Sequence, residues 1–202
     1  MTIVESEAEL RGCYEQPNEM VQKKILPRLD QHARAFIALS PFVVLASHGP
    51  DGSDASPRGD APGFVQVLDD ATLLLPDRRG NNLIDSLRNV VAEPDVGLLF
   101  LVPGINETLR VNGTARIISD AEKLLPLAAQ GKPPASALEI AVREVFFHCG
   151  KAMIRSKLWQ AESQVPRAAF PSLGRVIADQ IAGVDAEAAD ANLAESYKTR
   201  LY

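Results

Sequence analysis

The sequence has few of the residues that build covalent or metal-held frameworks. It contains two cysteines, Cys13 and Cys149, which are too few for a disulfide framework and favour a reducing, cytosolic environment. Its three histidines show no HExxH pattern and its cysteines no CxxC spacing, so we expect no metal site. His148 and Cys149 are adjacent, and neighbours in sequence rarely face one another, so a Cys–His nucleophilic pair is not expected. We expect Cys149 to be a buried, small hydrophobic residue.

The sequence also lacks a strong charge of one sign and any long apolar run. Its 21 basic and 26 acidic residues give a formal net charge of −5, which offers no electrostatic reason to bind nucleic acid. The longest apolar runs, such as Val96–Val102, are far too short to span a bilayer. The first ten residues, MTIVESEAEL, have neither a basic start nor an apolar core, so we expect no secretory signal and a cytoplasmic location. The GxGxxG, GxxxxGK(S/T) and GxSxG patterns are absent as well.

What the sequence does contain is typical of one globular domain over residues 1–202. Hydrophobic residues make up 46% of the chain, which argues against wholesale disorder. Apolar residues recur at helical spacing on both sides of Pro27, which predicts N-terminal helices over about 17–39, with Asp30 as a cap. The last stretch is alanine-rich, acidic early and basic late, which suits a helix dipole and predicts C-terminal helices over about 172–202.

The middle of the chain has the pattern of strands. Short apolar or alternating runs predict strands at 41–47, 64–69, 71–76, 95–104 and 107–119. Turn-forming residues predict a loop at 48–63, and Asp69–Asp70 predicts a hairpin corner. An amphipathic helix is expected at 81–91, and Gly113 is expected to mark a bulge or a close approach. The first half of segment 136–159 fits helix and strand equally. Strands in such close succession favour an antiparallel sheet or barrel over alternating strands and helices.

The sharpest local feature is a basic turn, Asp77-Arg78-Arg79-Gly80-Asn81-Asn82, between an apolar strand and the amphipathic helix. Two adjacent guanidinium groups offer charged, bidentate donors, and the start of a helix offers free backbone N–H groups. Together these predict a phosphate site. A solvated, charged turn is the commoner explanation for such a composition.

Three other clusters hold polar groups. Arg58, in Ser56-Pro57-Arg58-Gly59-Asp60, either faces the same ligand or is a surface arginine in a loop. Thr108, Arg110 and Asn112 share one face of a strand by its period of two, and that face either lines a site or meets water. Segment 146–159 contains the only tryptophan together with many polar groups.

Taken in order, the segments from about Pro41 to Trp159 resemble the pyridoxamine 5′-phosphate oxidase-like superfamily of FMN-binding split barrels. The resemblance is strongest in PFVVLAS, SPRGDAPGFVQVLDDATLLLPDRRGNN and TLRVNGTARI, and it rests on the order of these segments. It implies a mainly β fold, namely an antiparallel, Greek-key-like split β-barrel with helices at both termini. It also implies a homodimer with the FMN site at the subunit interface.

The resemblance also assigns residues to the FMN site. The matching basic pair, Arg78 and Arg79, would hold the FMN phosphate, with Asn82 nearby, and the strand containing Thr108 to Arg110 would contact the flavin from the other subunit. The complete set of cofactor-binding residues that it implies is Ser56, Pro57, Arg58, Gly59, Leu75, Pro76, Asp77, Arg78, Arg79, Asn82, Thr108, Leu109, Arg110, Lys151, Arg155, Ser156 and Trp159.

The implied activity is that of an FMN-dependent oxidoreductase, which passes hydride or electrons between the flavin and a small organic molecule or a reduced nicotinamide. No second phosphate site is visible, and Pro76 replaces a hydroxyl residue often seen beside the flavin, which argues against pyridoxamine phosphate oxidation. No residue stands out as catalytic, so the substrate is open. Three alternatives are a non-catalytic flavin carrier or sensor, a barrel that uses deazaflavin F420 or haem, and a barrel that has lost the site.

Overall fold

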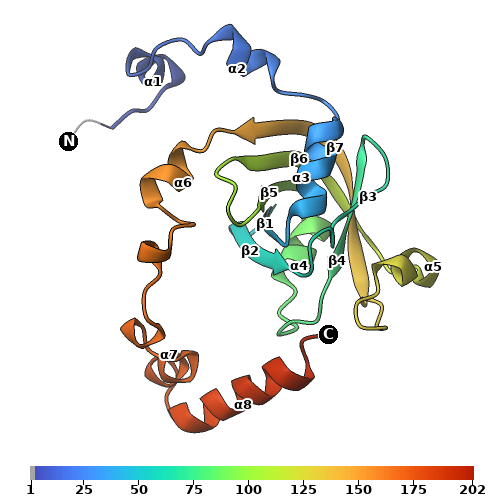
Figure 1. Cartoon of the computed structure of the whole chain (residues 1–202), viewed down its shortest axis with the longest axis vertical. Helices are drawn as coiled ribbons and strands as arrows, with labels where there is room; N and C mark the ends of the chain where they lie inside the picture. The colour runs from blue at the N-terminus through green and yellow to red at the C-terminus, as the bar shows by residue number, and fades with distance from the viewer. Residues whose placement is uncertain (1–2) are drawn as a thin grey trace.

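A computed structural model describes residues 3–202, and its centre is a seven-stranded antiparallel sheet (Figure 1). Across the sheet the order is β2-β1-β5-β6-β7-β4-β3. The strands are β1 (Phe42–Gly49), β2 (Gly52–Gly59), β3 (Gln66–Val67), β4 (Thr72–Asp77), β5 (Asp95–Leu101), β6 (Thr108–Ile118) and β7 (Ser136–His148). The predicted mainly β, antiparallel architecture with flanking helices is therefore confirmed.

The sheet curls into a barrel that stays open between β2 and β4. Arg58 on β2 and Asp77 at the end of β4 form an ion pair, with 2.6 Å between Nη1 and Oδ1. Strands β1, β5, β6 and β7 lie between these two strands in the sheet, so only curling brings them together. Among the described residues no backbone ladder joins β2 to β4. Side chains therefore close a gap that a complete barrel would close with strand pairing.

Two helices cover the curled sheet. Helix α3 (Gln31–Leu39) begins where Asp30 Oδ1 accepts a hydrogen bond from the Ala33 N–H at 2.8 Å, as the sequence predicted. Its buried Phe36 meets Phe147 of β7 edge to face, with ring centroids 5.5 Å apart. Helix α4 (Asp85–Ala92) packs on β1, where Asn89 Nδ2 donates to Ser47 Oγ at 3.0 Å.

The remaining helices lie in the two terminal arms and in one connection. They are α1 (Glu7–Gly12), α2 (Glu19–Lys23), α5 (Ala121–Leu124), α6 (Lys151–Ser156), α7 (Leu173–Gln180) and α8 (Ala186–Thr199), with short 3₁₀ turns at Leu125–Leu127, Ala161–Ser163 and Arg167–Ala169. Figure 1 shows the chain leaving the barrel after β7, passing through α6 and α7, and returning along α8 to the barrel. Among residues 3–202, no helix combines the length and the apolar character needed to cross a membrane.

Three predictions for the middle of the chain differ from the structure. Residues 52–59, expected in a loop, form β2, which pairs with β1 over its whole length. Because β2 is an edge strand, Pro57 lies in it without costing a ladder hydrogen bond. The predicted helix at 81–91 begins only at Asp85, after Asn82 and Ile84 with φ of 63° and 54°. The predicted strand at 64–69 is also shorter, since β3 contains only Gln66–Val67.

A bulge between β6 and β7 determines which side chains face outward. Asn112 pairs with Glu144 but the next residue, Gly113, pairs with Val142, so Arg143 is an extra residue in β7. Core-facing positions in β7 therefore change from Leu138, Ile140 and Val142 before the bulge to Val145 and Phe147 after it. The bulge predicted at Gly113 is confirmed, and it turns Glu144, Phe146 and His148 to the outer face.

Candidate functional site

Arg78, the first arginine of the basic turn, is fixed by an ion pair at the open side of the barrel. Its Nε donates to Asp60 Oδ2 at 2.6 Å, and its Nη1 donates to the carbonyl of Leu127 at 2.7 Å. The side chains of Arg78 and Asp60 are 18% and 5% exposed. Arg79, the next residue, is exposed. The turn therefore combines one held guanidinium with one that extends into solvent.

Arg58 lies beside this pair in a second network. Its Nε donates to Ser56 Oγ at 3.1 Å while its Nη1 binds Asp77. Ser56 Oγ is also 3.1 Å from the hydroxyl of Ser86 in α4. Ser86 in turn donates to Asp54 on β2 at 3.2 Å. The network ties β2, the end of β4 and the first turn of α4 to one another, so the structure brings Ser56, Arg58, Asp77 and Arg78 together.

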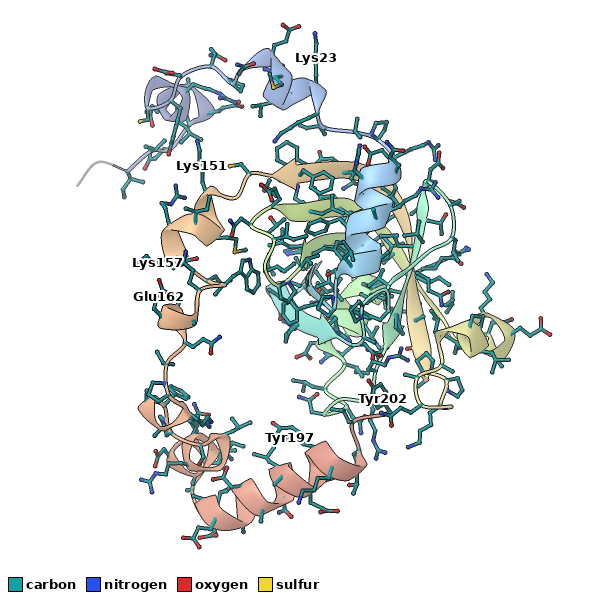
Figure 2. All side chains as sticks on the ribbon, in the orientation of Figure 1. Lys23, Lys151, Lys157, Glu162, Tyr197 and Tyr202 are labelled. Atoms are coloured by element: carbon teal, nitrogen blue, oxygen red, sulfur yellow. The ribbon has the colours of Figure 1, made fainter. Side chains whose placement is uncertain are left out.

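Tyr202 reaches the same place from the far end of the chain. Its hydroxyl donates to Asp60 Oδ1 at 2.7 Å, and its ring centroid lies 6.0 Å from the guanidinium carbon of Arg78. Burial of Asp60 opposes its ionisation, but hydrogen bonds from Tyr202, the Ala61 N–H and Arg78 outweigh this and lower the pKa of the carboxyl. The same hydrogen bond raises the pKa of Tyr202. Figure 2 shows Tyr202 beside the barrel, at the end of the returning arm.

The edge of β4 next to this cluster is partly unpaired. On one side β4 pairs with β7 from Thr72 to Asp77, but on the other β3 covers only Leu73 and Leu74. Among the described residues, none pairs with the outer edge of residues 75–77. The side chains of Leu75 and Pro76 are buried, so this edge offers a ligand the backbone carbonyl of Pro76 rather than side chains.

The basic turn does not lie at the start of a helix, contrary to the sequence prediction. Helix α4 begins seven residues after Arg78, and Asn82 lies in the exposed loop between them. Asn82 and Ile84 have positive φ, which a right-handed helix does not allow, so α4 cannot begin before Asp85. At Gly80, a Cβ would meet no heavy atom within 4 Å, so the surface beside Arg79 is open.

A second group of predicted residues lies elsewhere in the chain. Thr108 and Leu109 are buried in β6, and Arg110 extends from its outer face to bind Glu144 of β7. Asn112 donates to the same carboxylate oxygen at 3.1 Å, which confirms that Arg110 and Asn112 share a face. No described hydrogen bond or ion pair links this group to Arg58 or Arg78.

The late predicted residues form a third group on the C-terminal arm. Lys151, Arg155 and Ser156 are exposed on α6, and Ser156 Oγ donates to the carbonyl of Met153 in its own helix. Trp159 Nε1 donates to the carbonyl of Ile105 at 2.9 Å, which attaches this end of the arm to the barrel. Figure 2 shows Lys151 on the arm, far from Tyr202. One chain therefore does not bring this group to the arginines.

The sequence analysis did not assign three residues of the arginine cluster, Asp60, Ser86 and Tyr202. Asp60 was visible beside Arg58 but had no assigned role, and nothing in the sequence connected Ser86 or Tyr202 to the cluster.

Cys149 is exposed, not buried as the sequence predicted, and it directly follows β7. A backbone hydrogen bond from Lys151 is the main cause that lowers the pKa of its thiol. Within the described part of the chain, no three His, Cys, Asp or Glu residues gather in a way that could hold a metal ion.

The family model for pyridoxamine 5′-phosphate oxidase matches residues 29–149, which is more than half of the chain. The chain belongs to this family. The match covers the barrel with α3 and α4, whereas the N-terminal arm up to Arg28 and the C-terminal arm from Gly150 lie outside it. None of the curated proteins matches the chain.

Several solved structures are similar to this member of the family at low identity. HupZ of Group A Streptococcus is 17% identical, with 59% of this chain and 93% of that chain covered and a TM-score of 0.48. An FMN-binding protein of Syntrophomonas wolfei is 11% identical, with 65% and 87% covered and a TM-score of 0.46. A Clostridium acetobutylicum protein related to general stress protein 26 is 15% identical, with 58% and 85% covered and a TM-score of 0.45.

Proposed function

We propose that this protein binds FMN and acts as an FMN-dependent oxidoreductase, with the phosphate held at the open side of the barrel. The observation that carries the proposal is the arginine cluster, in which Arg58 and Arg78 are fixed by hydrogen bonds and Arg79 adjoins them. Family membership supports the same cofactor. The proposed phosphate ligands are Ser56, Arg58, Arg78 and Arg79.

The donors and charges of this cluster fit a phosphate group. Arg58 and Arg78 each use Nε and Nη1 within the protein, and the Nη2 of each makes no hydrogen bond to a described residue. Arg58 and Arg78 are paired with Asp77 and Asp60, whereas Arg79 forms no ion pair with a described residue. The open surface at Gly80 leaves room for an anion beside Arg79. Ser56, Arg58, Arg78 and Arg79 line neither of the two described hollows, so the phosphate would bind at an open surface.

The flavin ring requires apolar cover and polar backbone groups, and at the unpaired edge of residues 75–77 the chain presents the Pro76 carbonyl, an acceptor, because proline has no N–H. When bound, FMN supplies reversible hydride or electron transfer, and the protein supplies placement. The groups at Thr108–Arg110 and on α6 lie away from the arginines in one chain. A homodimer in which a second copy brings them to the ring would complete the predicted site.

FMN titration tests the phosphate assignment. Arg78→Ala together with Arg79→Ala should weaken FMN binding by at least about 2 kcal/mol, or about 30-fold in dissociation constant. Riboflavin, which lacks the phosphate, should bind both proteins equally. The control is Arg11→Ala with Arg175→Ala, which removes two exposed arginines elsewhere. An unchanged FMN affinity in the first variant would remove the phosphate assignment.

The spectrum and turnover of the purified protein test the cofactor and the activity. A flavin absorbs at about 450 nm, which distinguishes FMN from haem or deazaflavin. NADH or NADPH should reduce the FMN-loaded protein, with oxygen or a quinone as acceptor. If no donor reduces the flavin, the protein is a carrier or sensor. Light scattering should give the mass of a dimer, and a monomer that retains FMN would contradict the shared site.

A further inference from the structure

A group of nitrogen donors surrounds Phe146 on the outer face of β6 and β7. Lys24 Nζ lies 4.4 Å from the ring centroid and the Arg110 guanidinium carbon 5.1 Å from it. The His148 ring meets the same phenyl ring edge to face at 4.8 Å. Lys24, Arg110 and His148 come from three segments, namely the end of α2, β6 and β7. We call these three residues the Phe146 cation cluster.

The N-terminal arm is fixed where it supplies Lys24. The N–H of Leu26 donates to the carbonyl of Val145 at 3.0 Å, and the N–H of Val145 donates back at 2.8 Å. Beyond the bulge, β4 no longer borders β7, and Leu26 takes the free edge. Lys24 Nζ also donates to the carbonyl of Phe147 at 2.8 Å. The lysine is thus held in the cluster by its own backbone and by β7.

The positive charge of this cluster is only partly balanced. Glu144 is the carboxylate described within it, and its Oε1 accepts from both Arg110 and Asn112. Arg110 Nε is buried and has no hydrogen-bond partner among the described residues, an arrangement that costs free energy. Burial, Arg110 and Lys24 all lower the pKa of His148. Lys24 is also a minor cause, after the backbone hydrogen bond from Lys151, of the lowered pKa of the neighbouring Cys149.

A hollow of about 350 Å³ adjoins the cluster. It shares Asn112 and Glu144 with the outer face of β6 and β7, and the remaining lining residues are Ile25, Leu26, Pro27 and Arg143. Three of its six residues are apolar, so it suits a short hydrocarbon body better than a fully hydrated ion.

We propose that the Phe146 cation cluster binds the carboxylate of a small organic acid whose body lies in the adjoining hollow. Lys24 and Arg110 donate to the carboxylate, and the uncharged His148 ring donates one further hydrogen bond. Glu144 orients Arg110 and limits the net charge, so a singly charged anion is favoured over a polyanion. This site needs no flavin, although Arg110 is also among the residues proposed to contact FMN.

The three histidines of the chain allow a direct test by NMR. Sodium butanoate, added to the full-length protein at constant ionic strength, should shift the His148 ring resonances saturably, with a dissociation constant of about 1 mM or below. It should also raise the pKa of His148, because a bound anion favours the imidazolium. His32 and His48 lie outside the cluster and should not respond. The absence of a saturable His148 shift, or an equal shift with inorganic phosphate, would overturn the proposal.

Two adjacent lysines provide a matched pair of variants. Lys24→Met keeps the aliphatic part of the side chain and removes the charge. Because one charged hydrogen-bond donor to the carboxylate is lost, butanoate binding should weaken at least fivefold. Lys23→Met removes an equal charge from an exposed position on α2, where Lys23 pairs with Glu19, and should leave binding unchanged. Equal effects of both variants would contradict the location. Lys24 is not among the proposed FMN ligands, so failure here leaves the FMN titration with Arg78 and Arg79 unaffected.

Discussion

Replacement of Gly113 by alanine should weaken the junction of β6 and β7 that supports the outer polar face. A Cβ at this position would lie 2.2 Å from the carbonyl oxygen of Ala141 and 3.0 Å from its carbon. The strands must then separate by roughly 1 Å, which stretches neighbouring hydrogen bonds from about 2.9 Å to about 3.9 Å. Loss of two such bonds costs about 1–3 kcal/mol, within the range for overpacked sites.

Thermal unfolding would measure this effect. For a chain of this size, a loss of about 2 kcal/mol lowers Tm by roughly 4–8 °C. Gly12→Ala is the control, since a Cβ there meets no heavy atom within 4 Å. The His148 resonance should also move in Gly113→Ala, because the bulge sets the face on which His148 lies, whereas that of His48 should not. A Tm and a His148 resonance equal to wild type would refute the role given to the bulge.

Three further predictions concern Tyr202, Cys149 and Asp60. Tyr202→Phe removes the hydrogen bond to Asp60 and should speed hydrogen exchange of the backbone amides in α8 by about fivefold. Tyr197→Phe, at an exposed position of α8, should leave these exchange rates unchanged. Equal exchange rates in the two variants would contradict docking of the arm through Tyr202. The lowered pKa of the Cys149 thiol predicts that iodoacetamide modifies it before Cys13, which peptide mapping would check. The lowered pKa of Asp60 means that its ionised form stabilises the fold above pH 3.8, and that this contribution is lost as pH falls through the lowered pKa. Asp60→Asn should therefore flatten the acid limb of a stability–pH profile.

Short apolar runs were predictable as strands from the sequence, whereas the alternating segment 64–69 contains only the two-residue strand β3. The pattern of apolar residues located β1, β4, β5 and β6 because their apolar side chains meet the core. It did not locate β2, whose serine, aspartate, proline and glycine residues are typical of loops. Only pairing with β1 makes that segment a strand, and an edge position tolerates its composition.

The bulge explains why residues 136–148 fitted both helix and strand. Core-facing residues change phase at Arg143, so Leu138, Val142 and Val145 stand at i, i+4 and i+7. That spacing is the signature of one helix face, yet it arises here from a strand with one extra residue. The alternation of apolar and polar residues along the thirteen residues of β7 is interrupted by the bulge, which can be recognised only from the pairing with β6.

In the candidate site, too, residues close together in the sequence were predictable and contacts between distant residues were not. The basic turn was visible because Arg78 and Arg79 are adjacent, and Arg58 was visible in a short motif. The contact between Tyr202 and Asp60 spans 142 positions, and no local pattern encodes it. The ion pair between Arg58 and Asp77 likewise depends on the curling of the whole sheet.

Each arm outside the family match lies beside one of the predicted site residues within it, namely Arg110 or Arg78. The N-terminal arm supplies Lys24 beside Arg110 and His148, and the C-terminal arm supplies Tyr202 beside Asp60 and Arg78. The barrel provides the curled sheet, and the arginine cluster lies at its open side. If the flavin is bound there, its redox chemistry is common to flavoproteins and does not by itself select a substrate. We therefore expect selectivity to depend on the arms, so exchanging residues 3–28 between family members should alter ligand preference more than exchanging core residues of the barrel.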